Sequence, residues 1–340
     1  MNTAIRSSHC STKLKINKNN GKPARFAILL ITGDKMYNGV FPIFKEKGLT
    51  SHDVVYKMRK ILHMKKVGHT GTLDPEVTGV LPIVVGEATK LTEYMQMKDK
   101  SYSAEVTLGI ATDTEDAHGE VTDTRKIEPL SDEAVDQAVR SFIGEYHQQV
   151  PLYSSVKVDG RKLYEYARRG EPVERPVKTV YIREVERTGE IVSDGSTVKF
   201  NIDVTCSKGT YIRTLAVDIG RALGVPAHMS GLIRTASCGF NIDDTVTLDD
   251  LRELEDEKKK DCLQPVKDII SEENLLEIDD ENLLFKVQHG QKLMKSDIME
   301  MVSQKDKYIV FLKHGKPIGM YHQHPQKEDE LKPYKMFNRL

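Results

Sequence analysis

A single carboxylate, Asp74, is the group in residues 68–85 (GHTGTLDPEVTGVLPIVV) best placed to do chemistry. It directly precedes Pro75, and proline disfavours the helical region for its predecessor, so we expect Asp74 to lie extended on a stiff loop. Two glycines precede it, and either can adopt a positive φ or let another backbone pass close. The apolar run over 80–85 predicts a buried strand after the loop. A carboxylate on a rigid loop beside an apolar wall suits a reaction that needs one negatively charged oxygen.

Spacing alone leaves open that residues 68–85 form a simple turn, because Asp-Pro beside glycines is typical of turns. The order of residue types, however, resembles the signature of the TruB family of pseudouridine synthases over a long stretch without gaps. The resemblance implies that Asp74 is the catalytic carboxylate. It also implies that His69, inside the same loop, helps to hold RNA with one nucleotide turned out of its stack.

Arg213 is the second candidate catalytic residue. Residues 198–206 alternate apolar and polar side chains, which predicts a strand, and an apolar stripe over 212–223 predicts a helix. Arg213 therefore lies in the first turn of a helix that begins where a strand stops. The family resemblance implies that this arginine pairs with the catalytic aspartate, that Tyr211 contacts the substrate, and that Leu232 lines a pocket for uracil.

These groups suit the isomerisation of uridine to pseudouridine. The bond between ribose and uracil N1 breaks, the uracil turns, and a carbon–carbon bond forms at C5. Bond breaking at an anomeric carbon develops positive charge that one carboxylate can stabilise or capture. A guanidinium beside that carboxylate favours its ionised form and fixes its orientation. The sequence leaves open whether Asp74 attacks the sugar carbon or removes a sugar proton.

The target uridine must leave its stack before any carboxylate can reach it. Tyr102, at the start of a predicted strand, offers an aromatic face for the extruded base. The resemblance implies that this tyrosine also serves in the proton step at C5. No metal, nucleotide or flavin is needed for this chemistry, and the sequence contains no Walker or dinucleotide glycine motif.

Basic residues beside these motifs are candidates for RNA binding. Residues 160–170 (GRKLYEYARRG) predict a short basic helix able to contact phosphates and base faces, although its tyrosines could equally pack in the core. With the preceding segment 148–157 (QQVPLYSSVK), in which Val150 replaces a proline of the family pattern, it resembles the stand-alone bacterial members. The cations that we assign to RNA binding are Lys45, Lys90, Lys157 and Arg161.

Charge and cysteine content narrow the class of protein. The 340 residues carry a formal net charge of -1, but residues 1–66 hold fourteen lysines and arginines against three acidic residues. This basic region can attract phosphate locally. The four cysteines show no metal spacing, and no run is apolar enough to span a membrane, so we expect a cytoplasmic protein without a metal. The acidic turn 112–119 lacks the pattern of a calcium loop.

We predict a mixed α/β (α+β) fold. A pseudouridine synthase domain with a central mixed, largely antiparallel sheet is expected over 36–250, followed by an acidic linker over 251–275. A small β domain over 276–340 resembles the PUA-like RNA-binding tail of the family. Residues 1–35 are expected to be a disordered or upstream extension. We also predict helices over 87–97 and from Ser131 through Ile143, and strands over 285–287, 308–312 and 318–321.

The sequence also allows three other functions. Residues 154–157 satisfy Ser-x-x-Lys, the nucleophile motif of some serine acyl enzymes, but no companion motif accompanies it. A pure RNA-binding or tRNA-folding module is a second alternative, and a guide-RNA-dependent relative is a third. The resemblance favours the stand-alone enzyme, a monomer that binds the T stem-loop of tRNA and modifies the uridine at position 55 of the T loop.

Overall fold

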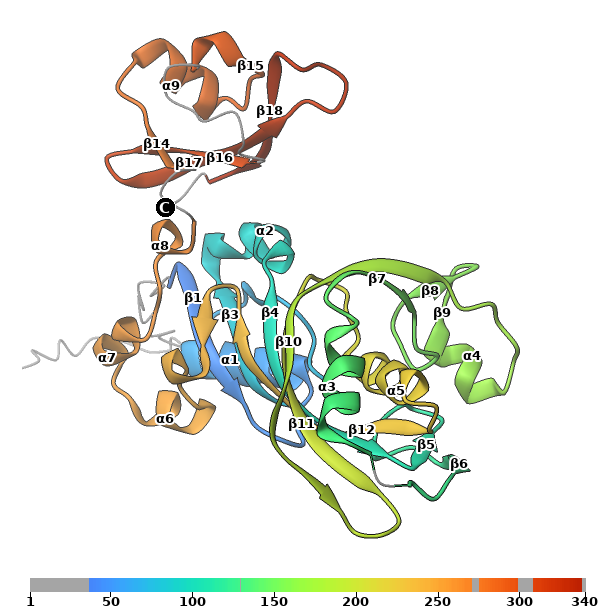
Figure 1. Ribbon diagram of the computed structural model, residues 1–340. Helices are drawn as coiled ribbons and strands as arrows, with labels where there is room; N and C mark the ends of the chain where they lie inside the picture. Colours follow the sequence, from blue (N-terminus) through green and yellow to red (C-terminus); the bar gives the residue numbers. More distant parts are fainter. Residues whose placement is uncertain (1–36, 129, 271–274, 299–307, 338–340) are drawn as a thin grey trace, which may run out of the picture. The chain divides into compact units, whose positions relative to one another are not determined.

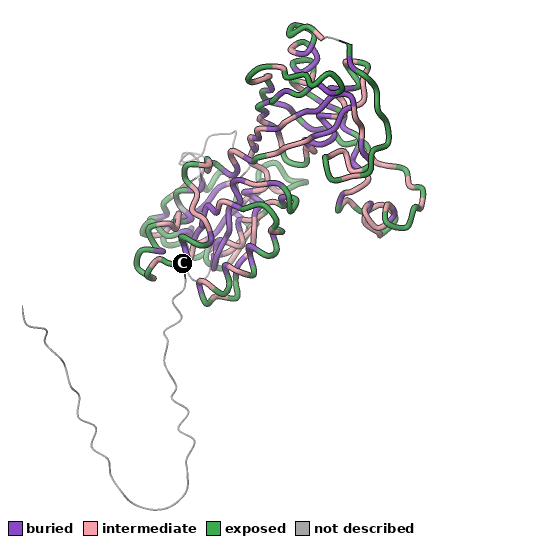
Figure 2. The backbone as a smooth tube through the Cα atoms, turned by 90° about the horizontal axis from the view of Figure 1, so that it is seen from below, coloured by how far each residue is buried: buried purple, intermediate pink, exposed green. Residues whose placement is uncertain are grey.

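The computed structural model describes residues 37–128, 130–270, 275–298 and 308–337, which form two β-sheets with helices packed against them (Figure 1). The predicted extension over 1–35 lies outside the described residues. Buried stretches of backbone concentrate in the strands of the sheets, whereas the loops between elements are mostly exposed (Figure 2).

The larger sheet has nine strands in the described part of the chain, ordered β1-β3-β12-β4-β11-β10-β7, with β2 paired to β3 and β13 to β12. Only the β3–β12 pair among them is parallel. The predicted mixed, largely antiparallel sheet is therefore confirmed. Its strands are β1 (Gly39–Lys45), β2 (Val67–His69), β3 (Thr78–Val85), β4 (Lys100–Leu108), β7 (Gly144–Gln149), β10 (Val177–Ser193), β11 (Val198–Cys206), β12 (Ala227–Ser237) and β13 (Phe240–Asn241).

Helices cover this sheet and close the main apolar core. The N-terminal end of α1 is fixed by a capping box between Thr50 and Asp53. The core lies between the strands and the apolar faces of α1, α3 and α5. The helices of this part are α1 (Ser51–Leu62), α2 (Thr92–Met97), α3 (Asp132–Arg140), α4 (Leu163–Arg169), α5 (Ile212–Ala222), α6 (Leu248–Glu253), α7 (Asp256–Asp261) and α8 (Val266–Ile269), with 3-10 turns η1 (Gly86–Leu91) and η2 (Ile242–Asp244). Two hairpins, β5 (Ile110–Thr112) with β6 (Val121–Thr124) and β8 (Lys157–Val158) with β9 (Arg161–Lys162), lie outside the sheet.

Two predicted helices are shorter than expected. The helix predicted over 87–97 is a 3-10 turn followed by the single short α2, because the hydroxyls of Thr89 and Thr92 donate to carbonyls three residues back and tighten the chain. The helix from Ser131 ends at Arg140, since the Ser141 hydroxyl donates to the Ala138 carbonyl.

The smaller sheet confirms the predicted C-terminal β unit. Its strands run in the order β14-β16-β17-β18-β15. The prediction of a strand over 285–287 is wrong: these residues lie in a helix whose first turn is capped by the carboxylate of Asp280. The domain boundaries and the PUA-like character of this unit stay predictions. Its elements are β14 (Leu275–Glu277), α9 (Glu281–Gln288), β15 (Leu293–Met294), η4 (Lys295–Asp297), β16 (Tyr308–Lys313), β17 (Lys316–Gln323) and β18 (Glu330–Met336).

Gly79 allows the parallel pairing of β3 with β12. Its φ is +112°, and a Cβ built on it would lie 2.2 Å from the carbonyl oxygen of Arg234. Only glycine combines that backbone conformation with so close an approach. Because the loop that carries Asp74 leads directly into β3, this contact also fixes where that loop ends.

Replacing Gly79 by alanine should lower the free energy of unfolding by more than about 3 kcal/mol, because strain in φ adds to a clash with backbone. Gly195→Ala is the matched control: its φ is +86°, but no described atom lies within 4 Å of its Cβ. We expect about 1 kcal/mol there, from φ alone. Urea denaturation measures both, and equal losses would contradict the close approach of β3 and β12.

Candidate active site

A cleft of about 900 Å³ opens beside the loop between β2 and β3. Five of the residues predicted from the sequence line it, although they come from separate segments of the chain. These residues are Asp74, Tyr102, Tyr211, Arg213 and Leu232. The sheet brings them together because β4, which carries Tyr102, pairs with β12 on one side and with β11 on the other.

Asp74 stands at the start of a tight turn. The N–H of Val77 donates to the Asp74 carbonyl at 3.1 Å, with Pro75 at the second position of the turn, where its fixed φ fits. The side chain of Asp74 is 52% exposed and so can be reached from the cleft. The expected role of Gly68 and Gly71 is not seen, since neither has a positive φ and a Cβ on either would meet only side chains at 3.5 Å or more.

Arg213 lies beside Asp74 in a fixed orientation. Its side chain is 10% exposed, and Nη2 lies 3.5 Å from Asp74 Oδ2. The guanidinium also donates to the carbonyls of Thr114 at 3.0 Å and Tyr153 at 3.1 Å. Its Nη1 lies 3.5 Å from Asp116 Oδ2. These contacts hold the guanidinium so that it faces the Asp74 carboxylate without having to reorganise.

Lys45 holds the backbone beside Asp74 through hydrogen bonds. Its ammonium donates to the carbonyls of Pro75 at 3.1 Å, Leu49 at 2.6 Å and Glu46 at 3.0 Å, and the side chain is fully buried. Burial lowers the pKa of Lys45, and the nearby Asp74 carboxylate opposes that shift. Because the buried ammonium donates to three backbone carbonyls, it is not available to contact RNA. The prediction that Lys45 binds RNA is therefore wrong.

Arg234 holds the other side of the same loop. Its guanidinium is 1% exposed and donates to the carbonyls of Val80 at 2.7 Å, Gly71 at 3.4 Å and Thr72 at 3.5 Å. The sequence pattern gave this arginine no role. An arginine directly after the apolar residues Leu232 and Ile233 is the signal that could have marked it, and in the sheet it pairs opposite Tyr102. Two buried cations thus fix the backbone on both sides of Asp74.

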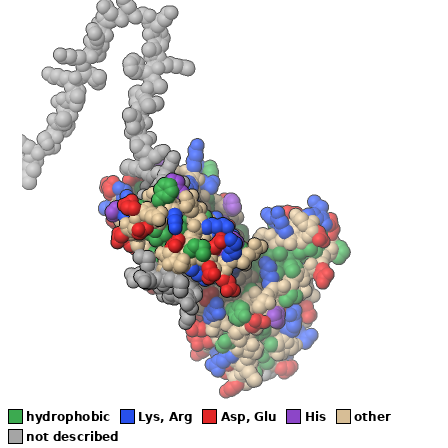
Figure 3. Space-filling model, turned by 90° about the horizontal axis from the view of Figure 1, so that it is seen from above, with side chains coloured by type: hydrophobic (Ala, Val, Ile, Leu, Met, Phe, Trp, Pro, Cys, Tyr) green, Lys and Arg blue, Asp and Glu red, His purple; other side chains and the backbone are tan. Residues whose placement is uncertain are grey.

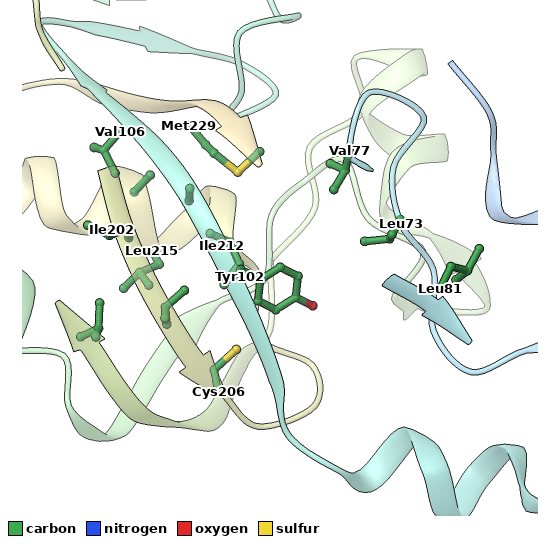
Figure 4. Packing of buried hydrophobic residues seen from close by; sticks show 14 of the residues in the cluster. Leu73, Val77, Leu81, Tyr102, Val106, Ile202, Cys206, Ile212, Leu215 and Met229 are labelled. Atoms are coloured by element: carbon green, nitrogen blue, oxygen red, sulfur yellow. The ribbon is translucent and has the colours of Figure 1, made fainter. Parts of the chain in front are cut away.

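Tyr102 is almost fully buried at the floor of the cleft. It lies between Ile212 on one side and Leu73 of the loop and Leu81 of β3 on the other, with its hydroxyl on the side of Leu81 (Figure 4). Burial raises the pKa of Tyr102, so the phenol stays protonated at neutral pH. The cleft therefore combines an oriented carboxylate, a buried phenol and an apolar wall, which suits a flat base attached to a sugar.

Comparisons with known proteins give the family. Residues 59–212 match the family described as "TruB family pseudouridylate synthase (N terminal domain)", and residues 213–271 match "tRNA pseudouridylate synthase B C-terminal domain". The chain is 47% identical over 306 residues to the tRNA pseudouridine synthase B of Bacillus pumilus, with 89% of this chain and 99% of the relative covered. The chain belongs to the TruB family. The resemblance of residues 68–85 is thereby confirmed.

Further similarities agree with this family. The tRNA pseudouridine synthase B of Staphylococcus epidermidis is 48% identical over 308 residues, covering 89% of this chain and all of the relative. The fold is similar to the solved "Crystal Structure of a Cbf5-Nop10-Gar1 Complex", with a TM-score of 0.65, 26% identity, and coverage of 88% of this chain and 84% of that one. The predicted enzyme class, a pseudouridine synthase, follows from the family.

Four further residues predicted to bind RNA in this TruB-family protein lie elsewhere than in the cleft lining. The His69 ring is half-buried, packs edge-on against His52, and has a pKa lowered first by burial. Lys90 donates to the Met336 carbonyl and pairs with Glu87. Lys157 is exposed on β8, and Arg161 pairs with Glu171 at 2.7 Å while stacking on Tyr166. Their roles in RNA binding stay predictions.

Lysines that the sequence reasoning did not select lie at the cleft instead. Lys178 and Lys208 are exposed residues of its lining, and Tyr164 of α4 lines it too. On the face shown in Figure 3, lysines and arginines are interspersed with acidic residues, so charge is local to particular sites. Lys178 lies near the start of β10, paired opposite Gln148 of β7, and Lys208 lies in the turn between β11 and α5. No motif in the sequence marks either position.

Within 37–128, 130–270, 275–298 and 308–337, no group of three His, Cys, Asp or Glu side chains is arranged to hold a metal ion. In the same residues, no helix has both the length and the apolar character needed to cross a membrane.

The Lys45→Met variant should lose about 2–4 kcal/mol of unfolding free energy, because three backbone carbonyls lose a charged donor. Lys47→Met is its control: this exposed neighbour pairs with Glu76 at 3.2 Å and should cost less than about 0.5 kcal/mol. Chemical denaturation measures both. Weaker RNA binding by Lys45→Met with unchanged stability would instead restore the role first predicted for Lys45.

Proposed function

We propose that this protein is a tRNA pseudouridine synthase that isomerises the uridine at position 55 of the T loop, with Asp74 as the catalytic carboxylate. The observation that carries the proposal is the contact of 3.5 Å between Asp74 Oδ2 and Arg213 Nη2 at the cleft. The names of relatives that are 47–48% identical over almost their whole length support tRNA as the substrate.

The dimensions of the cleft support extrusion of the target base. A volume of about 900 Å³ accommodates a nucleoside with part of its backbone but no paired stem. The uridine therefore enters alone, turned out of its loop. Leu232 and Tyr102 offer surfaces for the base, while Lys178 and Lys208 at the cleft lie where phosphates of the loop would pass.

The reaction then proceeds as an isomerisation without loss of atoms. Breaking the bond between C1′ and N1 leaves positive charge on the sugar, which the Asp74 carboxylate stabilises or captures. After the uracil turns, C5 bonds to C1′ and the hydrogen on C5 leaves as a proton, while N1 gains one. We assign Tyr102, which lines the floor of the cleft, to that proton step.

Arg213 contributes by holding the carboxylate. A guanidinium held by the carbonyls of Thr114 and Tyr153 and by Asp116 keeps the Asp74 carboxylate oriented while the base moves past it. This role serves equally well whether Asp74 attacks C1′ or removes a sugar proton. The T stem-loop as partner, the monomeric state and the cytoplasmic location stay predictions.

Two other RNA-related functions receive less support. The chain is 47% identical to a tRNA pseudouridine synthase B but 26% identical to the protein of the Cbf5-Nop10-Gar1 complex, which favours a tRNA enzyme over a guide-RNA-dependent relative. A protein that only binds or folds RNA has no need for an exposed carboxylate aligned with a buried arginine.

The Asp74→Asn variant should form product at least about 1000-fold more slowly, equivalent to about 4 kcal/mol of transition-state stabilisation, because the amide carries no charge. Release of tritium from C5 of uridine in tRNA, under single-turnover conditions, measures the rate. Binding of tRNA by filter retention should change by less than about 2-fold, since the side chain keeps its size.

Glu76→Gln provides the control for charge in the same loop. Glu76 pairs with exposed Lys47, lies outside the cleft lining, and should keep the unaltered rate. Product formation by Asp74→Asn at the normal rate would eliminate the mechanism. Normal tRNA folding activity in a variant that forms no product would separate any folding function from catalysis.

A further inference from the structure

Gln148 on β7 binds both backbone groups of a single residue at the cleft. The N–H of Tyr211 donates to Gln148 Oε1 at 2.7 Å, and Gln148 Nε2 donates to the Tyr211 carbonyl at 2.9 Å. The Gln148 side chain is 1% exposed, so no water competes for these bonds. A primary amide paired in this way fixes both the position and the orientation of the residue that it holds.

The residue held by Gln148 is the start of α5. Tyr211 is the N-cap residue, with φ −102° and ψ 110°, and its side chain makes no capping bond among the described residues. Its carbonyl also accepts the first helical hydrogen bond, from Leu215 at 3.1 Å. Helix starts are usually fixed by a side chain within the helix end itself. Here Gln148, on the strand β7, fixes the position of the N-cap residue and so sets where α5 begins.

Arg213 lies two residues beyond that start, in the first turn of α5. Any shift or rotation of the Tyr211 backbone is passed to Arg213 through two peptide units. The contact with Asp74 is 3.5 Å, the outer limit of hydrogen-bonding distance, so a small displacement would remove its directional component. Misplacement of a catalytic group by about 1 Å can cost about 100-fold in rate.

The body of α5 has its own hydrogen bond to β7, through Tyr146, whose hydroxyl also accepts from Gln148 Nε2 at 3.4 Å. Tyr146, two residues before Gln148 and on the same face of the strand, donates its hydroxyl to Asp218 in the second half of the helix. Burial, and next this hydrogen bond, raise the pKa of Tyr146, so the phenol remains a donor. Loss of the Gln148 amide would thus loosen the beginning of α5 and leave its body in place.

We propose that Gln148 is a positioning residue for the reaction. It sets Arg213 against Asp74 by holding the backbone of Tyr211, and it touches neither substrate nor reacting atoms. The proposal rests on the function proposed above, in which Arg213 aligns Asp74. Gln148→Met approximately keeps the volume of the side chain and removes both hydrogen bonds to the Tyr211 backbone, together with the longer one to the Tyr146 hydroxyl.

Gln148→Met should lower the single-turnover rate by about 10- to 100-fold while the KM for tRNA changes by less than about 2-fold. The control is Gln149→Met at the next position, where the side chain is exposed and bonds only to Arg175 among the described residues. It should keep the normal rate. A purely structural role for Gln148 would lower Tm and leave the rate of the folded protein unchanged, and that result would overturn the proposal.

Gln148→Glu provides a second variant if Gln148→Met does not fold. It keeps the size and the acceptor for the Tyr211 N–H but loses the donor to the carbonyl. We expect a loss of rate by about 5- to 50-fold, again with KM nearly unchanged. An unchanged rate in this variant would show that the pairing with Tyr211 does not position Arg213.

A double-mutant cycle tests whether Gln148 acts through Arg213. In an Arg213→Lys background, where the planar contacts are already lost, Gln148→Met should change the remaining rate by less than about 2-fold. A full additional loss would contradict action through Arg213. If Asp74→Asn forms no product and Gln148→Met is fully active, only the role of Gln148 fails; if Asp74→Asn is active, the proposed function itself fails.

Discussion

The ion pair between Asp74 and Arg213 is the contact on which the rest of the site depends. At 3.5 Å it is long for an ion pair, and the carboxylate is half-exposed, so its own attraction is modest. What makes it useful is that both partners are fixed before substrate arrives. Lys45 and Arg234 hold the backbone around Asp74, and backbone carbonyls hold the guanidinium of Arg213. Catalysis by a preorganised charge requires that arrangement.

The sheet explains why such distant segments meet. β4 lies in the middle of the sheet. Tyr102 on β4 therefore has β12, with Arg234, on one side and β11 on the other. The end of β11 leads through a tight turn into α5, which places Arg213 at the edge of the cleft. β3 leaves the Asp74 loop and runs parallel to β12, where Gly79 permits close contact. Each catalytic group therefore sits where a strand begins or ends.

Much of this could be predicted from the sequence because strong local patterns carried it. The Asp-Pro loop, the strand with Tyr102 and the helix start with Arg213 all have clear periodicity or turn chemistry, and the family resemblance supplied their roles. Lys45 was misassigned because the sequence does not distinguish a lysine that faces solvent from one whose ammonium binds three backbone carbonyls. Arg234 and Gln148 were missed because their partners are backbone atoms from distant segments, which no local pattern records. The strand predicted over 285–287 failed because its apolar residues are few enough to fit either period.

The most direct test of a preorganised carboxylate is a crystal structure of the Asp74→Asn protein with an RNA hairpin of T stem-loop sequence. We expect the target uridine turned out of the loop and into the cleft, with its C1′ within about 3.5 Å of the side-chain oxygen of residue 74. The backbones of the loop and of the α5 start should superimpose on those described above, with Arg213 still beside residue 74. A uridine that remains stacked in the hairpin, or one bound with C1′ far from residue 74, would contradict the account.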